Sequence, residues 1–305
     1  MGYRVDWQGS FPAICTPFTK DGALDEKAIR ANVRMTVDEG AHGMVICGHN
    51  GEAHLMSDDE RTRVTAWACE EVNGRIPVIA GTGHINTNDV IALTKAAKSV
   101  GANGAMVEAP YFMTPKKPDI LTHYQRISDA CDLPIKVYNN PSRAGCDITP
   151  EMLVTLAERA NIASIKDSMG NYERIMQLIQ AVGDRLRVFI GPARLFGFAG
   201  VTMGAHGFVD GLPQIAGRAA TRLYELAAAR NDAEGVPLQH RLFRLGHVMF
   251  HSAGTPPSTT KDAMRILGRP GGWPRAPLQA MEGQDLRKLE DALKSLSLVK
   301  GMAAE

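Results

Sequence analysis

Residues 134–168, PIKVYNNPSRAGCDITPEMLVTLAERANIASIKDS, contain the pattern that decides the fold. Two short runs, 134–140 and 162–168, are rich in apolar and β-branched side chains, which is typical of buried strands. Between them, residues 150–159 carry apolar side chains at helical spacing, and the Thr149-Pro150 pair is a favourable helix start. The stretch therefore predicts a strand, a helix and a second strand, which is the repeating unit of parallel sheets.

The same alternation continues in both directions along the chain. Further strands are expected at 11–18, 43–48, 76–83, 104–110, 187–193 and 205–211, and helices at 25–39, 58–72, 87–100, 119–130 and 172–182. Eight strands, each followed by a helix, favour a closed (β/α)8 TIM barrel, an α/β fold, over an open six-stranded sheet. No Gly-x-Gly-x-x-Gly motif opens a helix after the first strand, which speaks against a dinucleotide-binding fold.

The strand pattern ends near residue 230. Helices are expected beyond it at 233–251, 260–267 and 285–298, joined by Pro- and Gly-rich links at 254–257 and 269–277. The sequence thus predicts two regions. The barrel that carries the active site occupies residues 1–230, and a C-terminal helical extension occupies residues 231–305.

Composition excludes several classes of protein. The 305 residues carry 34 basic and 33 acidic side chains, so the chain has no broad basic field for nucleic acid. No apolar run approaches the ~20 residues that a membrane helix needs. Five cysteines without a Cys-x-x-Cys pair favour a cytoplasmic protein with reduced thiols. Nine histidines without a His-Glu-x-x-His motif predict no metal site, and no cofactor is expected.

In a (β/α)8 barrel, reactive side chains gather at the carboxyl ends of the strands. Lys166 lies late in the sixth strand. If it faces the interior, burial or a nearby cation would free its amine to attack a ketone and form a Schiff base, whereas an outward lysine would have no such use. Tyr138 ends the fifth strand as either a proton relay or a packed phenol. Arg143 follows it and either binds a carboxylate or is simply solvated.

Six short motifs, in this order and spacing, resemble the dihydrodipicolinate synthase / N-acetylneuraminate lyase family of Schiff-base aldolases over nearly the whole chain. They are Phe11-Pro12-Ala13 with Thr16-Pro17-Phe18, Gly48-His49-Asn50-Gly51-Glu52, Pro77-Val78-Ile79-Ala80-Gly81-Thr82-Gly83, Pro110-Tyr111-Phe112, Tyr138-Asn139-Asn140-Pro141 and Ile165-Lys166-Asp167. The resemblance implies a (β/α)8 barrel with a C-terminal helical part, assembled as a homotetramer (a dimer of dimers).

The resemblance also implies roles for individual residues. Lys166 would form the Schiff base with a 2-oxo acid, and Tyr138 would shuttle protons. The carboxylate of that acid would bind the loop of Gly48, Asn50 and Gly51, whose backbone N–H groups can face an anion.

Three positions depart from the synthase branch of the family, and two more, at the end of the eighth strand, lie near this site. His49 and Asn50 stand where that branch resembles Gly-Thr-Thr-Gly-Glu, and Phe112 stands where a neighbouring subunit's tyrosine completes a proton relay. His49 could transfer protons itself or only shape its loop. Val209 and Asp210 end the eighth strand, where Asp210 either contacts a substrate hydroxyl or caps a helix.

These observations favour a class I lyase that forms a Schiff base with pyruvate or a 2-keto-3-deoxy sugar acid, for aldol cleavage, condensation or dehydration. Two alternatives stay open at this point. One is 4-hydroxy-tetrahydrodipicolinate synthase, which condenses pyruvate with aspartate semialdehyde; His49 and Phe112 argue against it, while Arg143 is kept. The other is a non-catalytic protein that binds or senses 2-oxo acids. Lys136 shares strand parity with Tyr138, so it is expected one layer deeper, as a structural lysine, unless local twist or a bulge turns it outward.

Overall fold

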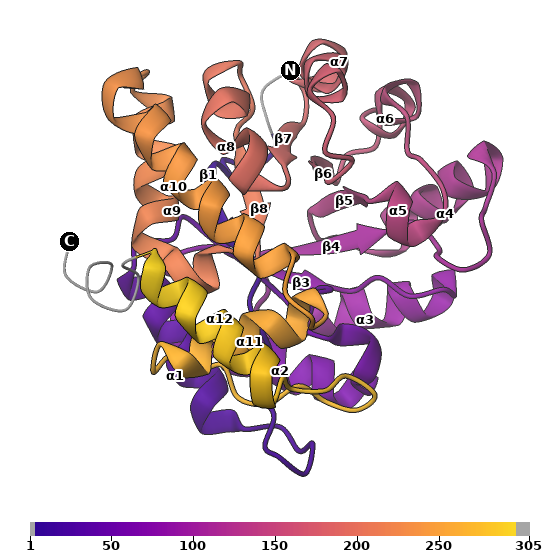
Figure 1. Cartoon of the computed structure of the whole chain (residues 1–305). Helices are drawn as coiled ribbons and strands as arrows, with labels where there is room; N and C mark the ends of the chain where they lie inside the picture. Colours follow the sequence, from indigo (N-terminus) through magenta and orange to yellow (C-terminus); the bar gives the residue numbers. More distant parts are fainter. Residues whose placement is uncertain (1–3, 297–305) are drawn as a thin grey trace.

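A computed structural model, described here over residues 4–296, contains a single sheet of eight parallel strands (Figure 1). The strands are β1 (Gly9–Pro12), β2 (Met44–Ile46), β3 (Val78–Gly81), β4 (Gly104–Glu108), β5 (Ile135–Asn139), β6 (Ile162–Asp167), β7 (Arg187–Ile190) and β8 (Gly207–Asp210). Their order is β1-β8-β7-β6-β5-β4-β3-β2, and a bridge between Ala13 and Val45 joins the two ends. The predicted eight-stranded parallel barrel is confirmed.

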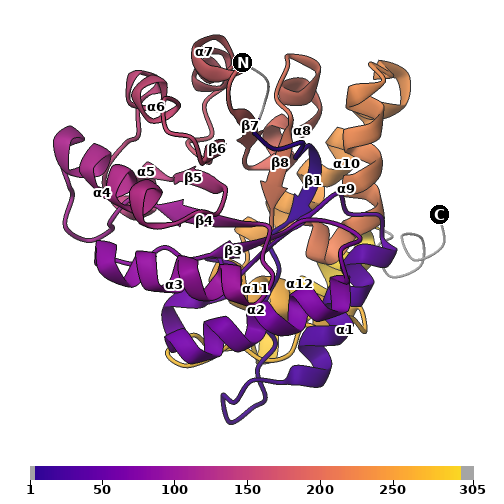
Figure 2. The ribbon, with the colours of Figure 1, turned by 180° about the vertical axis from the view of Figure 1, so that it is seen from behind.

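Helices surround the sheet, as Figures 1 and 2 show. They are α1 (Glu26–Asp38), α2 (Asp58–Val72), α3 (Thr87–Ser99), α4 (Lys117–Ala130), α5 (Pro141–Ala144), α6 (Pro150–Leu156), α7 (Tyr172–Val182), α8 (Ala193–Thr202), α9 (Pro213–Ala228), α10 (Asp232–Phe250), α11 (Pro256–Ile266) and α12 (Gly283–Ser295), with a 3-10 turn η1 (Ala53–Leu55). The predicted bounds of α2 and α7 are met residue for residue. At α2, Ser57 and Glu60 form a capping box that fixes the start.

Several segments differ from the sequence-based expectation, among them α5 and α9, for which no range was expected. The first strand is β1, earlier and shorter than 11–18, because its pairing with β8 ends at Pro12. Helix α8 follows the seventh strand, where no helix range was expected from the sequence, because Gly197 and Gly200 weaken the helical pattern. Helix α11 begins at Pro256, inside the expected link 254–257, because a proline is accepted in the first turn of a helix. Residues 297 and 298 of the last expected helix lie outside the described residues.

The C-terminal helices share a hydrophobic core with the barrel helices. One cluster of buried side chains joins Phe198 of α8 and Leu223 of α9 to Leu242, Met264 and Leu293 of α10, α11 and α12. Helix α10 starts directly after residue 230, yet it packs against α8 and α9. The division at residue 230 therefore stays a prediction about chain organisation.

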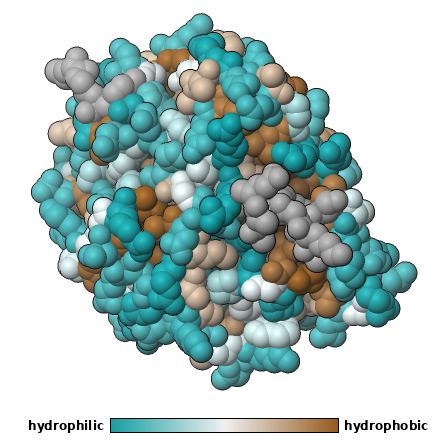
Figure 3. All heavy atoms as spheres, turned by 90° about the vertical axis from the view of Figure 1, so that its left-hand side faces the viewer, coloured by the Kyte–Doolittle hydropathy of each residue, from teal (hydrophilic) through white to brown (hydrophobic). Residues whose placement is uncertain are grey.

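The surface in the described range is mixed. The face in Figure 3 is largely hydrophilic, with scattered apolar areas. Phe112 and Met113, in the loop after β4, are the most exposed large apolar side chains, at 89% and 66%. Among the helices of residues 4–296, none is long and apolar enough to span a bilayer.

The barrel interior contains a buried cation, Lys136. Lys136 is fully buried and its Nζ donates a hydrogen bond to Ser164 Oγ at 2.8 Å. The same Nζ lies 3.2 Å from the ring centroid of Phe189, with the rings of Trp7 and Phe11 beyond 5 Å. Burial, and then the nearby Lys166, holds the pKa of Lys136 well below its ordinary 10.5. The expected inward position of Lys136, one layer below Tyr138, is thus found.

Lys136 should make the stability of the protein depend on pH. Between its folded and unfolded pKa values the unfolded chain binds the extra proton, so the folded state becomes more stable as pH rises towards 10.5. Lys136→Met removes this dependence. We expect the substituted protein to be the more stable one at pH 7, and its advantage to shrink by up to about 1.4 kcal/mol per pH unit on the way to pH 10.5.

Urea unfolding of both proteins between pH 7 and pH 10 measures this difference. Lys27→Met, at an exposed position of α1, is the matched control and should leave the curve unchanged. A lower stability of Lys136→Met at pH 7 would contradict the argument.

Candidate active site

Three inward side chains stand at one level on neighbouring strands. The parallel register pairs Glu108 of β4 with Tyr138 of β5, and Tyr138 with Lys166 of β6. Because side chains alternate along a strand, the same register places Met106, Lys136 and Ser164 together in the layer below. The upper layer lies at the carboxyl ends of the strands, where barrel chemistry is expected.

Lys166 faces the barrel interior. It is 7% exposed, and its Nζ lies 4.1 Å from the ring centroid of Tyr138. Its neighbours on β6 face outward. Ile165 packs in an outer hydrophobic cluster, and Asp167 accepts a hydrogen bond from Arg174 Nε at 3.4 Å. The strand parity that left two orientations open is thus resolved with the amine inside.

Tyr138 is held by hydrogen bonds from the residues that follow it. Asn140 Nδ2 donates to the Tyr138 hydroxyl oxygen at 2.9 Å, and Ser142 Oγ donates to Asn140 Oδ1 at 2.8 Å. Since the phenol oxygen accepts the bond from Asn140, its own proton stays available for donation. The short helix α5 that carries Ser142 begins directly after β5, so this support is local in sequence.

A cavity of about 250 Å³ opens at this end of the barrel. Eight of the predicted site residues line it: Gly48, His49, Asn50, Tyr138, Arg143, Lys166, Val209 and Asp210. The structure therefore brings most of the expected site together. Gly51 and Phe112 are not among its lining residues, and Phe112 is 89% exposed on its loop, with a positive φ of 71°.

His49 and Arg143 are in contact. A guanidinium nitrogen of Arg143 points at His49 Nε2. Burial, followed by Arg143, His54 and Lys166, lowers the pKa of His49 to about 3. The imidazole is therefore neutral near pH 7, and its Nε2 accepts the hydrogen bond that Arg143 donates.

Asp210 and Asn50 use their polar atoms within the protein. Asp210 accepts hydrogen bonds from the backbone N–H of Ala193 at 2.7 Å and of Leu212 at 3.2 Å. These bonds fix the start of α8 and the turn after β8. The side chain of Asn50 donates to Ala13 O at 2.7 Å and contacts Cys15 Sγ at 3.2 Å, which ties the glycine-rich loop to the segment that follows β1.

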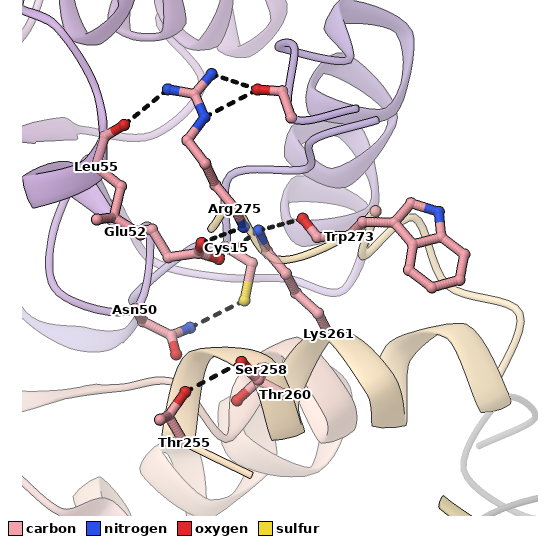
Figure 4. Close-up of polar contacts among 12 residues, drawn as sticks. Cys15, Asn50, Glu52, Leu55, Thr255, Ser258, Thr260, Lys261, Trp273 and Arg275 are labelled. Atoms are coloured by element: carbon pink, nitrogen blue, oxygen red, sulfur yellow. Dashed lines mark hydrogen bonds and ion pairs between the residues drawn. The ribbon is translucent and has the colours of Figure 1, made fainter. Parts of the chain in front are cut away.

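The loop at 48–52 is also bound to the C-terminal region (Figure 4). Glu52 forms a fully buried ion pair with Lys261 of α11, and it accepts a hydrogen bond from the backbone N–H of Arg275 at 2.9 Å. Lys261 Nζ also donates to Trp273 O at 2.8 Å. Glu52 has a left-handed backbone, with φ of 56°, so these contacts hold a strained residue in place.

Arg275 extends the same connection to the segment after the loop. Its guanidinium donates to both carboxylate oxygens of Glu60, at 2.7 and 2.8 Å, and to Leu55 O at 2.8 Å. The link at 269–277, which the sequence marks only as rich in Pro and Gly, is thus a binding segment for the loop that lines the site.

Sequence reasoning missed Glu108 and the residues around it. Glu108 Oε1 lies 3.6 Å from His54 Nε2, and His54 Nδ1 lies 3.2 Å from the Tyr111 hydroxyl. Buried Arg61 donates to Gly81 O at 2.7 Å and to Gly83 O at 3.2 Å. The signal for Glu108 was available, because strand parity with Met106 places it inward in the same way as it does Lys166.

Comparisons with known proteins agree with this geometry. The sequence model of the Dihydrodipicolinate synthetase family matches residues 6–296. A 4-hydroxy-tetrahydrodipicolinate synthase of Methanothrix thermoacetophila is 33% identical, and the match covers 97% of this chain and 99% of that protein. The chain therefore belongs to the dihydrodipicolinate synthetase family, as its motifs indicated.

Solved structures of relatives have the same fold. The chloride-inhibited dihydrodipicolinate synthase from Acinetobacter baumannii, complexed with pyruvate, superimposes with a TM-score of 0.91 at 33% identity, covering 95% of this chain and 99% of that one. YagE, a prophage protein of this family from E. coli K12, also in complex with pyruvate, gives 0.92 at 26% identity, covering 96% and 100%.

The Glu52–Lys261 pair should be essential to the fold around the loop. Lys261→Met leaves the Glu52 carboxylate buried without its cation, so we expect a loss of about 3–5 kcal/mol in the free energy of unfolding, measured in urea. The double variant Glu52→Gln/Lys261→Met removes both charges and should recover part of that loss. A single variant as stable as the parent would contradict this account.

Proposed function

We propose that this chain is a class I lyase that forms a Schiff base between Lys166 and a 2-oxo acid. The observation that carries the proposal is the enclosed Lys166 amine beside Tyr138, at the carboxyl end of the barrel and facing a cavity of about 250 Å³. The amine attacks the ketone carbon, and the carbonyl oxygen leaves as water. The protonated imine then accepts the electron pair of the bond that breaks at the neighbouring carbon.

In this proposal Tyr138 moves the proton. A hydroxyl whose oxygen already accepts a hydrogen bond from Asn140 has a fixed direction for its own proton, so it can exchange that proton with the substrate at each cycle. The substrate carboxylate binds the loop at Gly48 and Asn50, and Arg143 attracts anionic groups at the rim of the cavity. No metal or cofactor takes part.

For His49 we favour positioning over proton transfer. The Nε2 atom of neutral His49 already accepts the hydrogen bond from Arg143, so it is not free to take a proton from the substrate, and this contact orients the guanidinium towards the cavity. Asp210 likewise supports the turn after β8, since both of its oxygens accept backbone hydrogen bonds.

Hydroxylated 2-oxo acids, such as 2-keto-3-deoxy sugar acids, are the substrates that we favour. The relatives named 4-hydroxy-tetrahydrodipicolinate synthase support the alternative, condensation of pyruvate with aspartate semialdehyde. Phe112 lacks the hydroxyl that the resemblance assigns to the synthase relay at this position. His49 replaces a threonine of the synthase branch, so it has no hydroxyl either, and its ring contacts Arg143. These two residues are the reason for our preference. A protein that only binds or senses 2-oxo acids would have no need of the enclosed Lys166–Tyr138 pair.

The assembly and the location of the protein form part of the same proposal. We infer a homotetramer, and the exposed Phe112 and Met113 on one loop are consistent with a covered surface there. Sedimentation velocity measures this directly. The five free cysteines fit a reducing, cytoplasmic location, which fractionation of the native cells would test.

Borohydride trapping tests the Schiff base. Incubation with pyruvate and borohydride should add one reduced pyruvate group to the peptide that contains Lys166, as seen by mass spectrometry. Lys166→Arg should abolish the label, while Lys136→Met should keep it, because Lys136 lies below the cavity. Labelling at another lysine, or none with any 2-oxo acid, would contradict the assignment.

A substrate panel tests the reaction. Pyruvate release and dehydration should be measured on 2-keto-3-deoxy sugar acids, beside condensation of pyruvate with aspartate semialdehyde. We expect turnover on a sugar acid, and Tyr138→Phe should reduce kcat by about 10²- to 10⁴-fold without preventing imine formation. Faster turnover with aspartate semialdehyde would favour the synthase. Binding without any turnover would favour the sensor.

A further inference from the structure

A second, smaller cavity lies on the Glu108 side of Tyr138. Its volume is about 10 Å³, which is room for one water molecule. Polar groups from four segments surround it: His49, His54, Arg61, Glu108 and Tyr138. Because Tyr138 stands between Glu108 and Lys166 in the barrel register, this cavity and the Lys166 cavity meet at the same phenol.

Glu108 is placed in this cavity by the fold. Its side chain is only 15% exposed, and the absence of a side chain at Gly83 makes the space for it, since a Cβ there would lie 2.8 Å from Glu108 Cγ. Burial raises the pKa of Glu108, while Lys166, Arg61 and Arg143 act in the opposite direction. Burial thus makes the protonated form of this carboxyl group easier to reach than in a solvated glutamate.

The Glu108 carboxyl group is not paired with the buried cation beside it. Arg61, the buried cation of the same cavity, donates its hydrogen bonds to Gly81 O and Gly83 O. Within the described residues, the Glu108 carboxylate has its polar side-chain contact with His54, whose Nε2 lies 3.6 Å from Glu108 Oε1. A buried acid that only supported the fold would be expected to accept hydrogen bonds from such a neighbour.

His54 connects Glu108 to the surface. Its side chain is 38% exposed, and Nδ1 lies 3.2 Å from the Tyr111 hydroxyl. Burial, followed by Arg61, Arg143 and His84, lowers the pKa of His54, so the ring is neutral at pH 7. A neutral imidazole can take a proton on one nitrogen and release one from the other, which is the property that a relay needs.

We propose that Glu108 and His54 form a proton path that connects Tyr138 to solvent, completed by one water molecule in the small cavity. The proposal rests on the function proposed for Lys166 and Tyr138. A proton that Tyr138 takes from the substrate passes through the water to the Glu108 carboxylate, which gives it to His54 Nε2. His54 then releases its Nδ1 proton to the Tyr111 hydroxyl and to solvent, and the reverse sequence returns a proton for the next cycle. Glu108 and His54 thus act through Tyr138, as positioning and relay residues.

The path is tested by separating imine formation from proton exchange. Borohydride trapping of pyruvate on Lys166 reports the first step, and exchange of the pyruvate methyl protons with D2O, followed by NMR, reports the second. In Glu108→Gln, which keeps the shape of the side chain, we expect trapping as in the parent protein and methyl exchange slowed at least about 10-fold, with one limb of its pH profile lost.

Small-molecule rescue distinguishes a relay from a structural role. Formate should restore part of the exchange in Glu108→Ala, and imidazole should do so in His54→Ala. His240→Ala, at an exposed position of α10, is the matched control and should neither slow exchange nor respond to imidazole. If Glu108→Gln fails to fold, the response of His54→Ala to imidazole decides the question alone.

The outcomes separate the two proposals. Glu108→Gln with the exchange rate and pH profile of the parent, or slow variants that no small acid or imidazole rescues, would overturn the proton path and leave the lyase intact. A parent protein that is not trapped with any 2-oxo acid would instead overturn the proposed function.

Discussion

The alternation of side chains along closed parallel strands is the constraint on which the site depends. Once the barrel closes, every second residue of each strand must face inward, whatever its chemistry. On β4, β5 and β6 this places Glu108, Tyr138 and Lys166 side by side at the upper level. It also forces Lys136 into the layer below, among aromatic rings, where it has Ser164 as its hydrogen-bond partner. The alternation of side chains thus places the proposed reactive residues in one layer and the buried cation Lys136 in the layer below it.

The loop at 48–52, which lines the cavity beside these residues, is held in place by the C-terminal region. The loop at 48–52 contains two glycines and a left-handed glutamate, so by itself it would have many conformations. Lys261 and Arg275 hold Glu52 from outside the barrel, and Arg275 grips Glu60 beyond the loop. The helical extension therefore stabilises the loop that lines the active site, although none of the side chains proposed for the chemistry comes from it.

Much of this arrangement could be predicted from sequence, because periodicity and strand parity act locally. The eight strands and most of the helices around them follow from patterns within single segments, whereas parity alone left two orientations open for Lys166. The contacts that set the roles of His49 and Asp210 do not. His49, in the loop after β2, meets Arg143 of α5, and Asp210 of β8 meets Ala193 of α8, so these partners become visible only in the folded barrel. Glu108 is a different case: the parity argument applied to it equally, but no motif drew attention to it.

The electrostatics of the cavity link these observations to the class of ligand. Lys166 and Arg143 both line it, and Asp210, the acid in its wall, is already engaged with two backbone N–H groups. Burial, and then the positive charges of Arg143 and Lys166 together with His54, lowers the pKa of His49 to about 3 and keeps it neutral. An uncharged ligand would leave those cations desolvated without compensation, whereas a carboxylate would offset the cost. Lys166 and Arg143 thus favour an acid as the ligand, while the Glu108 carboxyl group lies on the other side of Tyr138, where the proposed proton path begins.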